Sequence, residues 1–136
     1  MKKIIYGRVN LADFYLKELP NLSDVEVSGI FDCSRNNLTG LKGCPHTVRV
    51  DFECYNNKLS TLSGCPHDVG GNFDCGENPL TDLNDIPKNI GGNFYIDVLH
   101  RDKFSEEFIR SLSYIKGHVY YLNESGYVDE APYGDY

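Results

Sequence analysis

The residues best suited to metal or thiol chemistry are cysteines that recur at regular intervals. Five of them follow one another at spacings of 11, 10, 11 and 10 residues: Cys33, Cys44, Cys54, Cys65 and Cys75. Two begin the motif Cys-Pro-His, so that His46 follows Cys44 and His67 follows Cys65 by two residues. Two thiolates and two imidazoles are a ligand set for tetrahedral zinc. One hypothesis is therefore a zinc site made of Cys44, His46, Cys65 and His67.

A packing role explains the same cysteines more simply. Ile86 and Ile96 occupy the corresponding positions of another copy of the pattern, and Lys88 stands where a histidine ligand would be needed. A free cysteine behaves as a small hydrophobic residue and is often fully buried. We therefore expect cysteines in the core, histidines in exposed turns, and neither a bound metal nor a cofactor.

A second regular set consists of three acids and a tyrosine at 21-residue spacing: Asp32, Glu53, Asp74 and Tyr95. Each lies between a phenylalanine and a Cys or Ile, and strand alternation turns it away from the core. Acids directly opposite one another on a sheet repel, by roughly 1 kcal/mol per pair at solvent-like dielectric.

Two interpretations of this row remain open. Either the surface tolerates an acid that was copied with the repeat, or the row faces a basic partner or a cation. Flanking positions add Tyr55, Arg35 and Asp97 to the predicted partner-binding set. Aromatic residues beside polar groups are typical of a protein interface.

Catalysis is not expected of this acid row. Acid–base chemistry with two carboxylates needs two environments that separate their pKa values, whereas a repeat gives each acid a similar environment. The paired glycines at 70–71 and 91–92 are in-phase bends and not a phosphate-binding loop between a strand and a helix. We predict that the protein is not an enzyme.

The elements that must position these residues are copies of one 21-residue unit. Its columns include a phenylalanine (Phe31, Phe52, Phe73, Phe94), an asparagine (Asn36, Asn57, Asn78) and a closing aliphatic residue (Val48, Val69, Ile90). One unit cannot bury its apolar side alone, so the units must stack with their strands in parallel. We expect the asparagines to satisfy backbone groups where the chain bends after each strand.

The segment 31–41 resembles the leucine-rich-repeat motif L-x-L-x-x-N-x-L-x-x-L, with Phe31 and Cys33 in the strand positions. The sequences of segments 62–66 and 71–75 are similar to those of small leucine-rich-repeat proteins of tailed phages. This resemblance covers residues 27–96. It implies an α/β, β-rich leucine-rich-repeat solenoid with a short parallel sheet. It also implies a phage-encoded protein that binds, and inhibits or redirects, a host defence protein in the host cytoplasm.

The ends depart from the repeat, as caps do. We expect one domain over 1–136, with a degenerate N-terminal cap over 1–30, regular repeats over 31–96, a helix-containing C-terminal cap over 97–122 and an acidic, tyrosine-rich tail over 123–136. A strand at 3–6 and a strand-like coil from Val9 are predicted, with a helix over 11–18 as the alternative. Ser105 is a plausible N-cap for a helix that ends before Gly117, and 118–122 is a strand candidate.

Composition restricts the class of partner. Thirteen Lys and Arg against 20 Asp and Glu give a net charge of −7, which disfavours nucleic acids and anionic membranes as partners. No apolar run is long enough to cross a membrane, and an odd number of cysteines without a signal-peptide core favours a cytoplasmic location. We expect a non-catalytic protein-binding module whose partner has a basic or mixed polar surface. The alternatives are a nucleic-acid mimic and a self-assembling structural protein.

Overall fold

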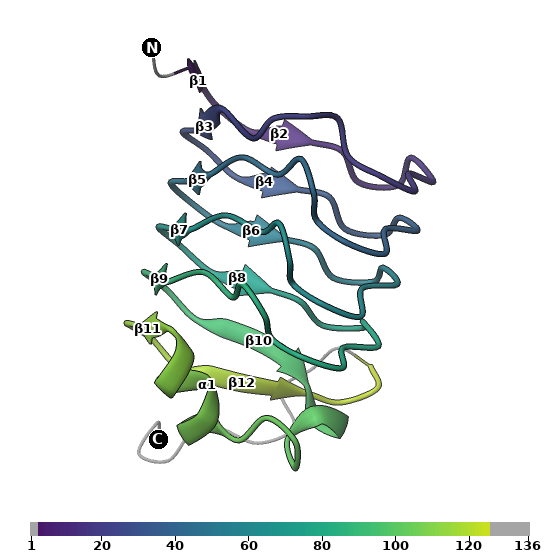
Figure 1. The fold of residues 1–136 in the computed structure, drawn as a ribbon, viewed down its shortest axis with the longest axis vertical. Coiled ribbons are helices and arrows are strands. Elements are labelled where there is room, and N and C mark those ends of the chain that lie inside the picture. Colours follow the sequence, from purple (N-terminus) through teal and green to yellow (C-terminus); the bar gives the residue numbers. More distant parts are fainter. Residues whose placement is uncertain (1–2, 126–136) are drawn as a thin grey trace.

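The computed structural model describes residues 3–125 as a solenoid with two parallel sheets of six strands each (Figure 1). The first sheet contains β1 (Lys3–Ile5), β3 (Val25–Val27), β5 (Thr47–Val48), β7 (Asp68–Val69), β9 (Asn89–Ile90) and β11 (Tyr114–Ile115). The second contains β2 (Val9–Asn10), β4 (Phe31–Asp32), β6 (Phe52–Glu53), β8 (Phe73–Asp74), β10 (Phe94–Asp97) and β12 (Val119–Leu122). The β-rich solenoid and its helix-containing cap are as predicted.

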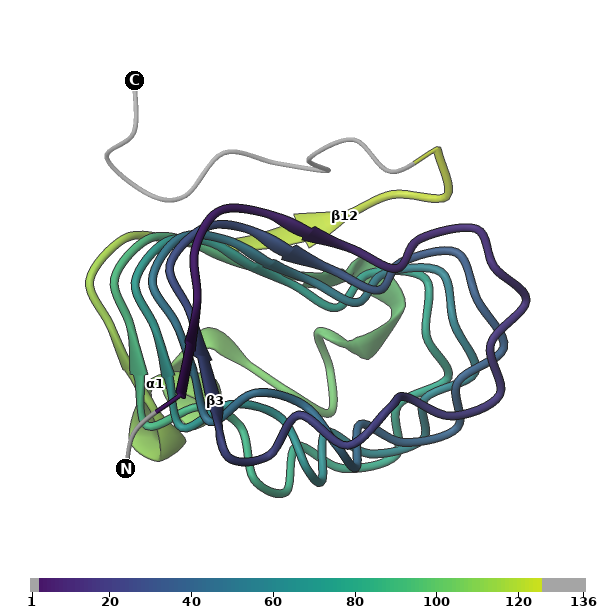
Figure 2. The same cartoon turned by 90° about the horizontal axis from the view of Figure 1, so that it is seen from above.

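The second strand of each unit is the main difference from the expected single sheet. The closing residues Val48, Val69 and Ile90 lie in strands β5, β7 and β9, which pair in register with one another. These strands contribute a single apolar column to the sequence, without the second apolar column two positions on that marks β4, β6 and β8. Figure 2 looks along the stack and shows how each coil passes from one sheet to the other and returns through irregular turns.

The core is built from columns of identical side chains. Phe31, Phe52, Phe73 and Phe94 lie in register on neighbouring strands and are fully buried. Their rings stack nearly parallel, with centroids 5.3–5.7 Å apart. Aromatic pairs of this kind contribute about 0.5–1.5 kcal/mol beyond the area that they bury, so each coil is fixed against the next by its phenylalanine.

The predicted asparagine column is confirmed. The Asn57 side-chain amide donates to the carbonyl oxygens of Cys33 and Cys54, both at 3.1 Å, and its carbonyl accepts the Leu38 N–H at 3.0 Å. Each bond joins the bend of one coil to that coil or to the coil before it. Asn36 and Asn78 make equivalent contacts. Buried backbone groups that would otherwise lack partners are satisfied in this way.

The N-terminal residues form a degenerate coil and not a helix. Strand β2 pairs with β4 through Val9 opposite Phe31 and Asn10 opposite Asp32, which confirms the coil predicted from Val9. The alternative helix over 11–18 is wrong, because Asp13 and Tyr15 adopt left-handed backbone angles of φ 63° and 56°. Such angles interrupt a right-handed helix.

The C-terminal cap follows the prediction with one correction. A 3₁₀ turn, η1 (Val98–His100), leads to helix α1 (Glu106–Leu112), whose N-cap Ser105 accepts the Phe108 N–H at 3.1 Å. The helix ends at Leu112, several residues before the predicted stop near Gly117, because the chain turns into β11. Strand β12 extends the second sheet beside β10. Most of the predicted acidic tail, residues 126–136, lies outside the described part of the chain.

Candidate functional site: the acidic strand face

The register of the second sheet brings the predicted row together on its outer surface. Asn10, Asp32, Glu53, Asp74, Tyr95 and Tyr120 lie directly opposite one another in sequence along β2, β4, β6, β8, β10 and β12. We call Asp32, Glu53, Asp74 and Tyr95, with the flanking Tyr55, Arg35 and Asp97, the acidic strand face. Its side chains come from strands β4, β6, β8 and β10 and from the bends after β4 and β6.

Tyr120 is a member of the row that sequence reasoning missed. Its ring stacks on Tyr95 with centroids 5.2 Å apart, so two tyrosines stand side by side at the C-terminal end of the row. Alternation between Val119 and Tyr121, which are both buried, already turns Tyr120 outward. Its position opposite Tyr95 became clear only from the pairing of β12 with β10.

Asp32 differs from the expectation of an exposed acid. Its side chain is buried, and the residue as a whole is 3% exposed. One carboxylate oxygen accepts the Ser34 N–H at 2.9 Å and the Ser34 hydroxyl at 2.6 Å, and the other pairs with the Arg8 guanidinium at 3.2 Å. Asp32 therefore has its own counter-ion and a structural role at one end of the row.

Glu53 and Asp74 are half-buried, and the structure raises the pKa of both carboxyls. Burial, followed by the charge of Asp32 and a hydrogen bond to it, raises the pKa of Glu53 to about 7. Burial is also the main cause that raises the pKa of Asp74 to about 6, and a hydrogen bond from the Gly76 N–H opposes it. Among the described residues neither acid has an ion-pair partner within 4.0 Å. The centre of the row thus holds two poorly solvated carboxyl groups that have no ion-pair partner among the described residues.

The flanking residues are tied into the corners of the coils. The Arg35 guanidinium donates to both carboxylate oxygens of Asp13 at 2.9 Å and to the Tyr55 hydroxyl at 2.6 Å. The Asp97 carboxylate accepts the backbone N–H of Glu77 at 2.8 and 2.9 Å. Arg35 and Glu77 both have left-handed backbone angles. Arg35 and Asp97 therefore hold the rim of the face, and Tyr55 is positioned by Arg35.

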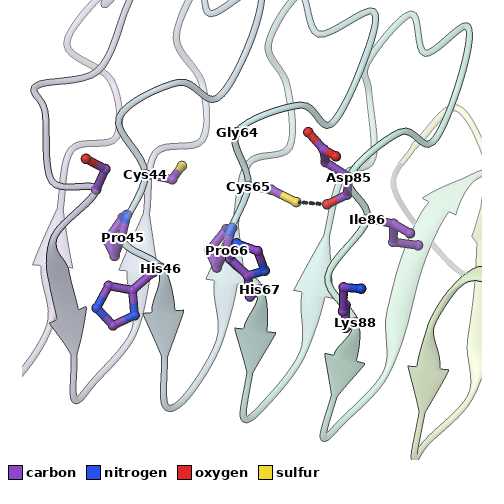
Figure 3. Close-up of a pocket in the computed structure, with 11 residues that line it drawn as sticks. Cys44, Pro45, His46, Gly64, Cys65, Pro66, His67, Asp85, Ile86 and Lys88 are labelled. Carbon is purple, nitrogen blue, oxygen red and sulfur yellow. Dashed lines mark hydrogen bonds between the residues drawn. The ribbon is translucent and has the colours of Figure 1, made fainter.

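The cysteines and histidines of the zinc hypothesis line a hollow of about 270 Å³ at the turns that precede strands β5, β7 and β9 (Figure 3). All five cysteines are buried and free, as predicted for core packing. The Cys65 thiol donates to the Asp85 carbonyl at 2.7 Å, and burial raises the pKa of Cys44 and of Cys65 well above the ordinary range. Within residues 3–125 no three His, Cys, Asp or Glu side chains are grouped to hold a metal ion. The structure does not bring Cys44, His46, Cys65 and His67 together as ligands.

Comparison of the chain with protein-family models, curated protein sequences and solved structures finds no match. In the described part of the chain, no helix has both the length and the apolar character needed to cross a membrane. A fold by itself does not specify an activity, so the function depends on the chemistry of the surfaces that this fold presents.

Proposed function

We propose that this protein is a non-catalytic binding module whose acidic strand face binds a protein with a basic or mixed polar surface. The observation that carries the proposal is the pair Glu53 and Asp74, two half-buried carboxylates with pKa values raised to about 7 and about 6. A cationic side chain placed between them would stabilise both anions. Their unfavourable state in the free protein is thus a source of binding free energy.

The tyrosines supply the apolar part of the same surface. Tyr95 and Tyr120 stack at one end of the face, and Tyr55 stands beside its centre, held by Arg35. Tyrosine and arginine are enriched among the residues that dominate binding energies at protein interfaces. A face with carboxylates in the middle and aromatic rings at its border fits a partner that presents Lys or Arg within an otherwise mixed surface.

A binding role fits the chemistry of the chain better than catalysis. The thiols are buried, and burial raises their pKa values, so the thiolate needed for nucleophilic attack is disfavoured. The raised pKa values of Glu53 and Asp74 both arise mainly from burial, so the two carboxyls are not set apart as an acid and a base. A nucleic-acid mimic is less well supported, since Arg8 neutralises Asp32 and Glu53 is partly protonated near neutral pH.

The class of partner follows from the resemblance to phage leucine-rich-repeat proteins. On that basis we propose that the protein is phage-encoded and acts in the host cytoplasm, where it inhibits or redirects a host defence protein. The 21-residue repeats, the parallel strands and the asparagine column at the end of each strand support a leucine-rich-repeat assignment. This part of the proposal depends on the motif and not on the chemistry of the face.

The test is a pull-down of tagged protein from bacterial lysate at roughly 100 mM and 500 mM salt. The double variant Glu53→Gln/Asp74→Asn removes the two charges while keeping the size of the side chains. The matched control, Glu18→Gln/Glu107→Gln, removes two exposed charges away from the face. We expect one host protein to be captured by wild type and control at both salt concentrations, and to be lost from the double variant. Equal capture by all three forms would show that the face is not the binding site.

A further inference from the structure

A groove of about 660 Å³ lies between helix α1 and the turn of the last regular coil. Within the regular stack, each turn rests on a turn of the same shape. After residue 97 the chain forms a 3₁₀ turn and a helix in place of another such turn. The turn at 81–86 is therefore followed by a segment of different shape, and the groove lies where the two do not close on each other.

The floor and one wall of this groove are apolar. Leu83, Ile86 and Phe104 line it and are buried. Phe108 and Leu112 lie one turn apart on α1, line the same groove, and are each 43% exposed. The Phe108 ring stacks on the Phe104 ring with centroids 6.1 Å apart, so the wall continues into the floor. Apolar and aromatic linings around a volume of about 300–1,000 Å³ are typical of small-molecule sites.

Two lysines add positive charge to the apolar lining. Lys88 and Lys103 both line the groove, and neither has an ion-pair partner within 4.0 Å among residues 3–125. The Lys103 ammonium lies 5.4 Å from the centroid of the Phe104 ring, which places it over the aromatic part of the lining. A few charged groups beside an apolar surface fix the orientation of a ligand that has both kinds of group.

The two acids of the groove are directed elsewhere. One carboxylate oxygen of Asp82 accepts the Thr61 hydroxyl at 2.8 Å and the Asn84 N–H at 2.9 Å. The Asp85 carboxylate lies on the Cys65 side of its coil, apart from the lysine of the same turn (Figure 3). Neither acid forms an ion pair with a lysine of the groove. The lysines are therefore the charged groups that a ligand in the groove can pair with.

From these observations we propose that the groove binds a small organic carboxylate. Its apolar body, aromatic or aliphatic, lies against Phe104 and Phe108, and its carboxylate pairs with Lys88 and Lys103. The dimensions favour a small molecule over another protein, because α1 has seven residues and is only about 10 Å long, whereas one side of a standard protein interface uses roughly 20–30 residues. This inference is independent of the acidic strand face.

The test titrates the full chain with two fluorescent probes that share one ring system. Anilinonaphthalene sulfonate carries an anionic group in place of the carboxylate, and phenylnaphthylamine is the same ring system without that group. The double variant Lys88→Gln/Lys103→Gln removes both cations of the groove. Its matched control, Lys42→Gln/Lys58→Gln, removes two exposed lysines that do not line the groove. Decanoate and decanol then compete with the sulfonate probe, as a carboxylate and an uncharged molecule of the same chain length.

The apolar wall is tested by Phe108→Ala, with Leu99→Ala as its control because Leu99 is 74% exposed and does not line the groove. Phe108→Ala should weaken both probes several-fold, and Leu99→Ala should weaken neither. Circular dichroism of all variants should match that of wild type.

We expect wild type to bind one sulfonate probe per chain and to release it to decanoate more readily than to decanol. The double variant Lys88→Gln/Lys103→Gln should bind the sulfonate probe about tenfold more weakly, as expected for the loss of two exposed ion pairs, and the neutral probe with nearly unchanged affinity. The absence of probe binding to wild type overturns the proposal. Equal affinity of wild type and this variant for the sulfonate probe also overturns it, and so does an equal loss in the lysine control.

Discussion

At the residue scale, the fold depends on buried polar side chains that make hydrogen bonds and ion pairs with neighbouring coils. Asn57 contacts backbone groups of four other residues and is itself buried. Asp32 is equally enclosed and is balanced by Arg8 and Ser34. Glu53 and Asp74 occupy the same column as Asp32 but lack such partners among the described residues. Identical positions in the repeat therefore have different electrostatic surroundings.

Removing the asparagine amide should destabilise the solenoid strongly. Asn57→Ala leaves the Cys33 and Cys54 carbonyls and the Leu38 N–H without this partner. An unsatisfied buried group costs about 1–3 kcal/mol, so we expect a loss of about 3 kcal/mol in the free energy of unfolding, measured by urea titration. Asn84→Ala, at an exposed turn, is the control and should change it by less than about 0.5 kcal/mol. Similar losses in both variants would contradict a special role for the column.

The raised pKa of Glu53 predicts how stability varies with pH. A carboxyl whose pKa rises from 4.5 to about 7 on folding is destabilising as an anion. The favourable contribution of the protonated Glu53 carboxyl to the free energy of unfolding is complete below about pH 4.5 and is lost as the pH rises through about 7. Glu53→Gln should therefore raise the free energy of unfolding at pH 8 by roughly 1–2 kcal/mol, after allowance for solvent screening. At pH 4.5 the difference between variant and wild type should nearly vanish. A difference that does not vary with pH would show that the Glu53 charge is well solvated in the folded protein.

At the element scale, the close stacking of the coils depends on tight turns in which one backbone lies against the next. Gly64 has φ 92°, and a Cβ built there would lie 2.6 Å from the backbone nitrogen of Lys42. The turn of one coil thus rests directly on the backbone of the coil before it. Asp85 occupies the next position of this column with φ 63°, which is a conformation that aspartate tolerates better than most residues.

Gly64→Ala should cost about 2 kcal/mol or more of unfolding free energy. The left-handed angle alone costs an alanine about 1–2 kcal/mol, and the contact with Lys42 cannot relax without moving backbone. Gly40→Ala is the control, because Gly40 has no positive φ and its Cβ would meet nothing within 4 Å. It should be neutral or slightly stabilising. Thermal and urea unfolding of both variants would check this, and equal effects would contradict the close packing of the turns.

At the scale of the whole molecule, the stack shares one continuous core from the N-terminal coil to α1. The five cysteines are distributed over three successive coils of that core, and all five are buried. Exposure of any one thiol requires the local stack to open. Thiol chemistry therefore reports on the integrity of the whole solenoid.

Thiol labelling of the native protein should be slow at all five positions. We expect an aromatic disulfide reagent to react at least a hundredfold more slowly in buffer than in 6 M guanidinium chloride, where all five thiols should react. The physical reasons are burial and the raised thiol pKa values. Peptide mapping of the labelled sites would identify any exception. A cysteine that reacts in buffer at nearly its unfolded rate would mean that its coil is not closed.

The amino-acid sequence by itself determined the repeat, and with it the phenylalanine column, the asparagine contacts and the buried cysteines. These features depend on spacing and side-chain type, which stacking of equal units converts directly into position. The tertiary structure alone decided three other features: the first sheet with its strands β5, β7 and β9, the place of Tyr120 beside Tyr95, and the burial of Asp32. Strands β5, β7 and β9 show a single apolar column in the sequence, without the second apolar column two positions on that marks β4, β6 and β8. The register of β12 could not be read from the repeat, because the segment between β10 and β12 contains helix α1 and departs from the 21-residue spacing. The surroundings of Asp32 depend on Arg8, a residue in another coil, so no local pattern could reveal them.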